Sequence, residues 1–167
     1  MPYAFQAMYG RGAGLSDEGL LRKQNALRKA IEINRPDPDD ALDVLAKVGG
    51  FDLAGLAGLY IGAALYRIPI LIDGLPSSVA ALIAARLVPN CIIAMFASHC
   101  SAEPVAKAIL SSLGLQAFLF ADMKLGEGTG AVCMLPLFDA ALSVYHGSVL
   151  FRDTGIEQYV PQGGEGT

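Results

Sequence analysis

A single carboxylate stands among three glycines near the C-terminal end of this sequence, a setting that could give it a chemical role. Glu127 lies in the stretch Gly126-Glu127-Gly128-Thr129-Gly130, ahead of a long apolar run that we expect to form a helix. Glycine removes side-chain bulk and permits positive φ, so the backbone here can approach another molecule closely. A helix N-terminus also favours a negative charge. These features favour an ionised carboxylate at a helix N-terminus, although alone they fit an acidic residue in a common glycine-rich turn better.

Polar residues gather at three places, each between a predicted strand and a predicted helix. The clusters are Asp73-Gly74 with Ser77, Ser98-His99 with Ser101 and Glu103, and 126–130. In open parallel α/β sheets, ligands bind outside the carboxyl ends of the strands. We therefore expect the three clusters to meet at one edge of a sheet and to form a shared ligand site.

The residue types in these clusters narrow the chemistry. Serine hydroxyls and backbone N–H groups ahead of a helix suit phosphate binding. The serines are not in the Gly-x-Ser-x-Gly elbow that exposes a nucleophile, and 126–130 has neither a Walker A lysine nor dinucleotide-binding spacing. Asp73 could orient a sugar hydroxyl, although an Asp-Gly turn more often caps the following helix. His99 resembles a structural histidine more than a metal ligand, and Lys23, one of several basic residues on its helix, a solvated charge.

Apolar periodicity and breaker residues predict the elements that must position these groups. We expect helices at 16–34, after an Asp37-Pro38 cap to Lys47, at 51–67, 79–87, 104–113 and from 129 onward. Strands are expected at 68–72, 91–96 and 115–120, the first two as buried apolar runs. The small residues Ala54, Gly58 and Gly62 predict close packing of the third helix.

This alternation predicts an α/β fold: a parallel Rossmann-like sheet with flanking helices, preceded by a helical N-terminal segment. We expect one α/β domain over 1–151 and a polar, frayed tail over 152–167. With 167 residues and 53% hydrophobic content, such a domain has a sizeable core, and chains of this length bury about 70% of their unfolded surface.

Composition limits the classes of partner and the cellular location. A net charge of −4 with only 12 Lys and Arg argues against a nucleic-acid surface. The apolar runs at 53–66 and 87–102 are shorter than the ~20 residues of a membrane span or are interrupted by polar residues and proline. The first residues lack the basic region of a signal peptide. The three cysteines form neither a metal spacing nor an even disulfide set. We expect a cytoplasmic protein with reduced thiols, no metal and no cofactor.

Five short strings occur in order along the chain and carry a family resemblance. They are Gly10-Arg11-Gly12-Ala13-Gly14, DVLAKVGGFD at 43–52, Ile72-Asp73-Gly74, SHCSAE at 98–103 and Leu125-Gly126-Glu127-Gly128-Thr129-Gly130-Ala131. Together they resemble the C-terminal half of nicotinate-nucleotide–dimethylbenzimidazole phosphoribosyltransferases. The similarity extends to about His146, so it covers nearly the whole chain.

The resemblance implies a function in assembly of the cobalamin nucleotide loop. Such enzymes transfer ribose 5-phosphate from nicotinate mononucleotide to 5,6-dimethylbenzimidazole, which gives α-ribazole 5′-phosphate and nicotinate. By carry-over, Glu127 would be the general base. The substrate-binding residues would be Lys23, Asp73, Gly74, Ser77, Ser98, Ser101, Leu125, Gly126 and Gly128. The resemblance also implies a homodimer that binds these two small molecules.

The chain departs from this family in length and at two positions. Family members are about twice as long, and Val105 and Lys124 replace a usual glycine and arginine. The alternative hypotheses are therefore a truncated, non-catalytic phosphoribosyl-binding or dimerisation module, and a half-enzyme that needs a separate N-terminal partner.

Overall fold

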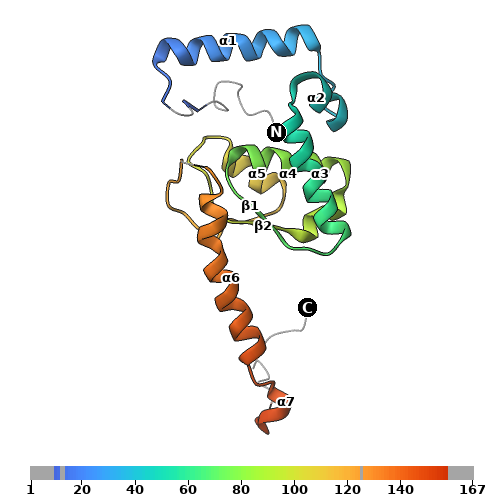
Figure 1. The fold of residues 1–167 in the computed structure, drawn as a ribbon, viewed down its shortest axis with the longest axis vertical. Helices are drawn as coiled ribbons and strands as arrows, with labels where there is room; N and C mark the ends of the chain where they lie inside the picture. The colour runs from blue at the N-terminus through green and yellow to red at the C-terminus, as the bar shows by residue number, and fades with distance from the viewer. Residues whose placement is uncertain (1–9, 12–13, 125, 158–167) are drawn as a thin grey trace, which may run out of the picture. The chain divides into compact units, whose positions relative to one another are not determined.

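The computed structural model describes residues 10–11, 14–124 and 126–157. The chain divides into two compact units, 1–134 and 135–167. Figure 1 shows its helices and strands. The candidate site residues predicted from the sequence all belong to the first unit. The predicted single domain over 1–151 stays a prediction.

The first two helices begin at side chains that cap their free N–H groups. Helix α1 (Asp17–Asn34) starts after Ser16, whose hydroxyl accepts a hydrogen bond from Gly19 N, and α2 (Ala41–Val48) starts after Asp40. The prediction for α1 is confirmed, but the predicted cap of α2 at Asp37 is wrong. The amide of Asp40 bonds to the carbonyl of Asp37, which closes a turn before the helix, and the Asp40 carboxylate then accepts from the first helical amides.

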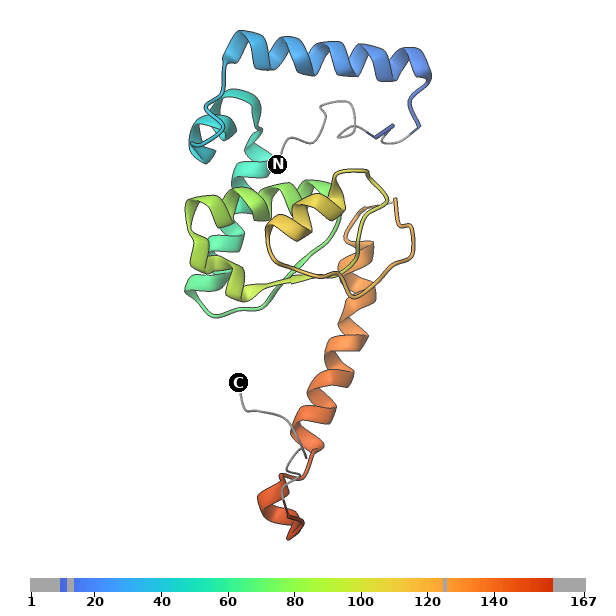
Figure 2. The ribbon, with the colours of Figure 1, turned by 180° about the vertical axis from the view of Figure 1, so that it is seen from behind.

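A short parallel sheet confirms the predicted α/β class. Strands β1 (Ile70–Ile72) and β2 (Met95–Ala97) pair in parallel, with Ile72 opposite Ala97. Helix α4 (Leu75–Leu87) follows β1, and α5 (Ala106–Ser112) follows β2. Both helices lie on the same side of the two strands (Figures 1 and 2).

The sheet is smaller than the sequence predicts. Residues 89–94 form a 3-10 helix, η2 (Pro89–Ala94), which starts with a proline and buries Cys91 and Ala94 three residues apart. The predicted strand 91–96 is therefore wrong over most of its length. The predicted strand 115–120 is also wrong as a regular strand, because its only ladder contact among the described residues is a bridge between Leu119 and His99.

The first strand is buried on one face only, whereas the sequence predicted burial on both. Ile72 is 1% exposed and packs in the core, while Leu71, which points to the opposite face, is half-buried and Ile68 is exposed. An apolar run alone does not reveal which face a neighbouring element covers.

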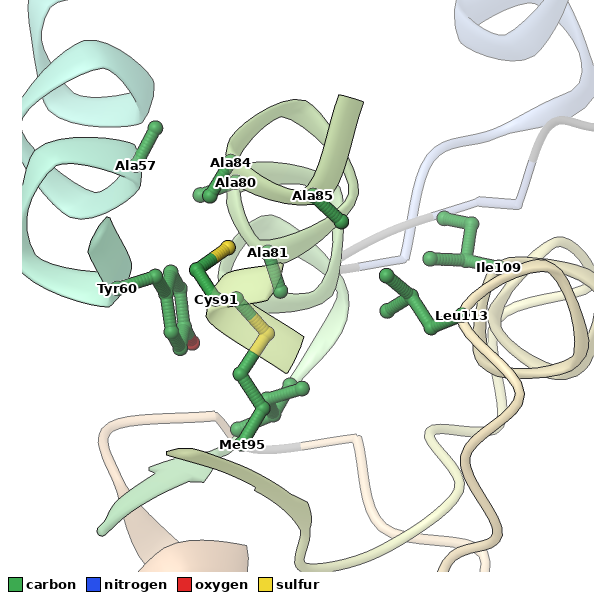
Figure 3. Close-up of a cluster of buried hydrophobic side chains, with 11 residues drawn as sticks. Ala57, Tyr60, Ala80, Ala81, Ala84, Ala85, Cys91, Met95, Ile109 and Leu113 are labelled. Atoms are coloured by element: carbon green, nitrogen blue, oxygen red, sulfur yellow. The ribbon is translucent and has the colours of Figure 1, made fainter. Parts of the chain in front are cut away.

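Small side chains allow the helices above the sheet to pack closely. Helix α3 (Phe51–Leu65) contributes Ala57 and Tyr60 to the core, against an alanine-rich face of α4 (Figure 3). Within the described part of the chain, the predicted packing stripe of Ala54, Gly58 and Gly62 is not the face of α3 that packs in the core. A Cβ added at Gly58 or Gly62 would meet no described atom within 4 Å.

The last long helix is confirmed. Helix α6 (Thr129–Gly147) begins in the first unit, and its residues from 135 belong to the second unit together with α7 (Phe151–Thr154). The start of the predicted frayed tail is therefore helical, and 158–167 lie outside the described residues. Within the described part of the chain, no helix combines the length and apolarity needed to cross a bilayer.

Candidate functional site

The carboxyl ends of the two strands border a cavity of about 560 Å³. Asp73 directly follows β1, and His99 and Ser101 follow β2. Seven residues predicted from the sequence line this cavity: Lys23, Asp73, Gly74, Ser77, Ser101, Gly126 and Glu127. The expected meeting of the three polar clusters at one sheet edge is confirmed.

Glu127 occupies a turn with an unusual backbone. Gly126, Glu127 and Gly128 have φ values of 74°, 57° and 76°, so a non-glycine residue lies between two left-handed glycines. The left-handed conformation costs an L-residue roughly 1–2 kcal/mol. Residues held in such conformations cluster at functional sites, where the surrounding structure fixes them. The flanking glycines and the cavity therefore distinguish Glu127 from an ordinary turn residue.

Asp73 fixes this turn from the neighbouring strand end. Its two carboxylate oxygens accept hydrogen bonds of 3.1 Å from the amides of Gly128 and Ala131. These amides belong to the free N-terminal end of α6, which starts at Thr129. The carboxylate that binds the helix N-terminus is thus Asp73 rather than Glu127, whose side chain is left exposed in the cavity wall.

Two buried polar residues, Ser98 and His99, lie next to Asp73. Ser98 is 0% exposed, and its hydroxyl donates to the carbonyl of Ile72 over 2.6 Å. The imidazole of His99 is also buried, with Nδ1 3.1 Å from Ser98 Oγ and 4.0 Å from Asp73 Oδ1. Gly130 packs so closely on this ring that any Cβ there would overlap Nδ1. Gly130 is therefore required by close packing.

Ser77 is held by its own helix turn and by a buried tyrosine. Its hydroxyl donates to the carbonyl of Gly74 over 2.9 Å. Tyr60 comes from α3, where it is 2% exposed. Burial raises the pKa of Tyr60 to about 12, although a hydrogen bond with Ser77 acts in the opposite direction. Tyr60 thus links the core to a residue of the cavity wall.

The raised pKa of Tyr60 predicts a loss of stability at alkaline pH. Above pH 10 the unfolded chain releases the phenol proton, while the folded chain retains it up to about pH 12. The contribution to stability is therefore complete below pH 10 and is lost as the pH rises towards 12. Urea unfolding at pH 9 to 11 should show an extra decrease of up to ~1.4 kcal/mol per pH unit relative to Tyr60→Phe. Equal pH dependence of the two proteins would contradict this prediction.

Two lysines bring positive charge to a cavity wall that also carries the carboxylates of Asp73, Glu103 and Glu127. The ammonium group of Lys23, on α1, donates to the carbonyl of Gly10 over 3.2 Å, and Lys124 precedes the glycine turn. Glu103 lies against Gly10, where a Cβ would overlap its carboxylate. Two cations beside serine hydroxyls form a suitable environment for a phosphate group. Among the described residues, no three His, Cys, Asp or Glu side chains are grouped as metal ligands.

The remaining predicted residues have different positions. The Gly128 amide donates a hydrogen bond to Asp73, and the Ser98 hydroxyl donates one to the carbonyl of Ile72. Gly128 and Ser98 do not line the cavity. Leu125 lies outside the described residues. Ligand contacts for these three residues stay predictions without support from the geometry.

The sequence prediction missed five residues of the cavity wall, Leu56, Leu75, Pro76, Met123 and Lys124. It placed His99 and Glu103 in the shared site but gave them no ligand role. His99 and Glu103 belong to a polar cluster that follows a strand, so their signal was present. Leu56 gave no signal, since it enters the wall from an apolar helix.

Comparison with known proteins gives consistent results. A family model described as phosphoribosyltransferase matches residues 2–156. Nicotinate-nucleotide–dimethylbenzimidazole phosphoribosyltransferase of Acetivibrio thermocellus is 55% identical over 155 residues, which cover 93% of this chain and 44% of the relative. The protein of the same name from Ruminiclostridium cellulolyticum is 47% identical over 154 residues, with coverages of 92% and 44%.

A solved structure shares the fold over the same extent. The crystal structure of CobT from Thermus thermophilus superimposes with a TM-score of 0.82 at 38% identity, and the match covers 93% of this chain and 46% of that chain. The chain thus spans less than half the length of the relatives that it matches.

Proposed function

The chain belongs to the phosphoribosyltransferase family whose model spans residues 2–156. On this premise we propose that the protein catalyses, in the cavity described above, the transfer of ribose 5-phosphate from nicotinate mononucleotide to 5,6-dimethylbenzimidazole. The products would be α-ribazole 5′-phosphate and nicotinate, in cobalamin biosynthesis. Relatives that are 47–55% identical carry the name of this activity. The observation that carries the proposal is the position of Glu127, on a left-handed turn in the wall that also contains both lysines.

Glu127 would act as the general base. One nitrogen of the benzimidazole attacks the anomeric carbon of the ribose, while Glu127 accepts the proton of the other nitrogen. The bond between that carbon and the pyridinium nitrogen breaks, and its electron pair neutralises the ring of the departing nicotinate. No general acid is needed, because the leaving ring is already cationic. Positioning and electrostatic stabilisation would supply the remaining rate enhancement.

The ribose phosphate would lie between the strand ends and the lysines. Ser101 and Gly74 follow the two strands, and Lys23 and Lys124 bring positive charge to the same cavity. Serine hydroxyls and ammonium groups are donors that match the acceptor oxygens of a phosphate. Ser77 would contact the same ligand from the first turn of α4.

A half-enzyme that needs a second polypeptide segment is the other candidate. It is favoured by one observation: the chain covers 44% of the length of each of the two relatives described above. In that case the cavity would bind the mononucleotide, while turnover would require the region of the relatives that this chain does not match. A solely ligand-binding module would bind without turnover under any condition.

The proposed function is tested by nicotinate release. Nicotinate mononucleotide and dimethylbenzimidazole are incubated with the chain, alone and with the unmatched region of the Acetivibrio relative produced separately. We expect release that falls ~10²–10⁴-fold in Glu127→Gln, the usual contribution of a general base. Glu18→Gln is the matched control, since Glu18 lies on the exposed face of α1 and pairs with Arg22. Absence of release under both conditions would contradict the proposed activity.

We also propose a cytoplasmic homodimer, as the family resemblance implies. Helix α3 supports the dimer because its exposed side chains include Phe51, Leu59 and Leu65, beside glycines where an added Cβ would meet no atom of another described element within 4 Å. The three free cysteines fit a reducing compartment. Sedimentation equilibrium, in which a dimer has twice the mass of 17.5 kDa, tests the oligomeric state.

A further inference from the structure

Within the described part of the chain, one ring nitrogen of a buried histidine beside the cavity has no hydrogen-bond partner. His99 is 4% exposed and lines the cavity. Its Nδ1 edge is covered by Ser98, Asp73 and Gly130. No hydrogen bond involves Nε2 among the described residues, and buried polar atoms normally have a partner. Because His99 lines the cavity, we expect a molecule bound in the cavity to supply the partner of Nε2.

The hydrogen bonds of Ser98 determine which ring nitrogen carries the proton. Its hydroxyl lies 2.6 Å from the carbonyl oxygen of Ile72, and only the serine can supply a hydrogen to that contact. The single hydroxyl proton is thus committed to Ile72. The 3.1 Å contact between Ser98 Oγ and His99 Nδ1 then requires a proton on Nδ1. In the neutral ring Nε2 is left as an acceptor.

We propose that His99 binds substrate through Nε2, which accepts a hydrogen bond from a ribose hydroxyl. This inference rests on the proposed function. An acceptor needs a donor, and the mononucleotide offers its ribose hydroxyls, whereas its carboxylate and ionised phosphate oxygens only accept. The benzimidazole N–H is assigned to Glu127. His99 would thus orient the sugar, and Ser98 would fix the orientation of His99.

Nitrogen NMR on the wild-type chain tests the proton assignment without any ligand. The chain has two histidines, so His146→Gln identifies the signals of His99. We expect a protonated Nδ1 and an unprotonated Nε2 in the neutral ring. A neutral ring with its proton on Nε2 would overturn the inference, because that nitrogen would then be a donor.

Two amide substitutions separate the role of each nitrogen. Asn places its amide near the position of Nδ1 and keeps a donor for Ser98, while Gln places its amide near Nε2. We expect His99→Asn to bind nicotinate mononucleotide about 3- to 10-fold more weakly by calorimetry, and His99→Gln to retain more affinity. The analogue that lacks the contacted 2′- or 3′-hydroxyl should bind the wild type and His99→Asn equally.

The outcomes distinguish this inference from the proposed function. Wild-type affinity in a folded His99→Asn variant would show that the histidine has a structural role alone, which overturns the inference. If either variant fails to fold, comparison of the two deoxy analogues on the wild type decides: an affinity that depends on neither hydroxyl overturns it. A wild-type chain that binds neither nicotinate mononucleotide nor ribose 5-phosphate would contradict the proposed function, and this inference with it.

Discussion

Glu127→Gly should make the protein more stable while it strongly reduces the rate of nicotinate release. Glu127 has a φ of 57°, a conformation that glycine adopts without strain. After the greater backbone entropy of unfolded glycine is subtracted, we expect a gain of about 0.5–1 kcal/mol in the free energy of unfolding. Loss of the carboxylate should lower the rate of release ~10²–10⁴-fold. Urea unfolding and the release assay measure the two effects on one variant.

Arg35→Gly is the matched control for this prediction. Arg35 also has a positive φ, 42°, but it follows the end of α1 and does not line the cavity. It should gain stability to a similar extent and keep its rate of nicotinate release. If Glu127→Gly destabilises the chain while Arg35→Gly stabilises it, Glu127 has a structural role and the strain argument fails.

Asp73→Ala should destabilise the glycine turn at 126–128. The substitution leaves the amides of Gly128 and Ala131 without the acceptors that bind them over 3.1 Å. Hydrogen bonds to a charged group contribute about 1.5–3 kcal/mol each, and an unpaired amide adds a penalty where it is buried. We expect a loss of about 2–3 kcal/mol in the free energy of unfolding. Hydrogen exchange at Gly128 and Ala131 should become faster.

Activity in a double variant shows whether Asp73 acts through Glu127. If Asp73 mainly positions the base, Asp73→Asn should reduce nicotinate release in the wild type but cause little further loss in Glu127→Gln. Asp39→Asn is a control, because Asp39 lies in an exposed turn before α2. Independent, fully additive losses would instead indicate that Asp73 contacts the substrate directly.

The sequence predicted the site better than it predicted the sheet. Asp73, Ser101 and Glu127 were assigned to one edge because each follows a predicted strand, and all three line one cavity. The predicted position of these residues stayed correct although the strand boundaries were wrong, because the order of strand end, loop and helix is the same. Strand 91–96 was wrong because an apolar run with three-residue spacing of buried positions also fits a 3-10 helix.

The hydrogen-bond partners of Asp73 and His99 could not be predicted from the sequence. Asp73 looked like a ligand for the sugar or a cap of α4, but its oxygens bind amides 55 and 58 residues later in the chain. His99 resembled a structural histidine in a polar cluster, and the ligand role proposed for it depends on Nε2, which has no hydrogen-bond partner among the described residues. Both assignments depend on long-range geometry that local residue patterns do not contain.

The central claim is that the edge formed by the two strand ends holds nicotinate mononucleotide, and amide NMR during titration of this ligand tests it most directly. The measurement does not require turnover, so it applies to the chain alone. We expect saturable shifts at Gly74, Ser77, Ser101 and 126–131, and smaller shifts in a Ser101→Ala variant. Binding without shifts at these amides, or no binding at millimolar ligand, would contradict the assignment of this cavity.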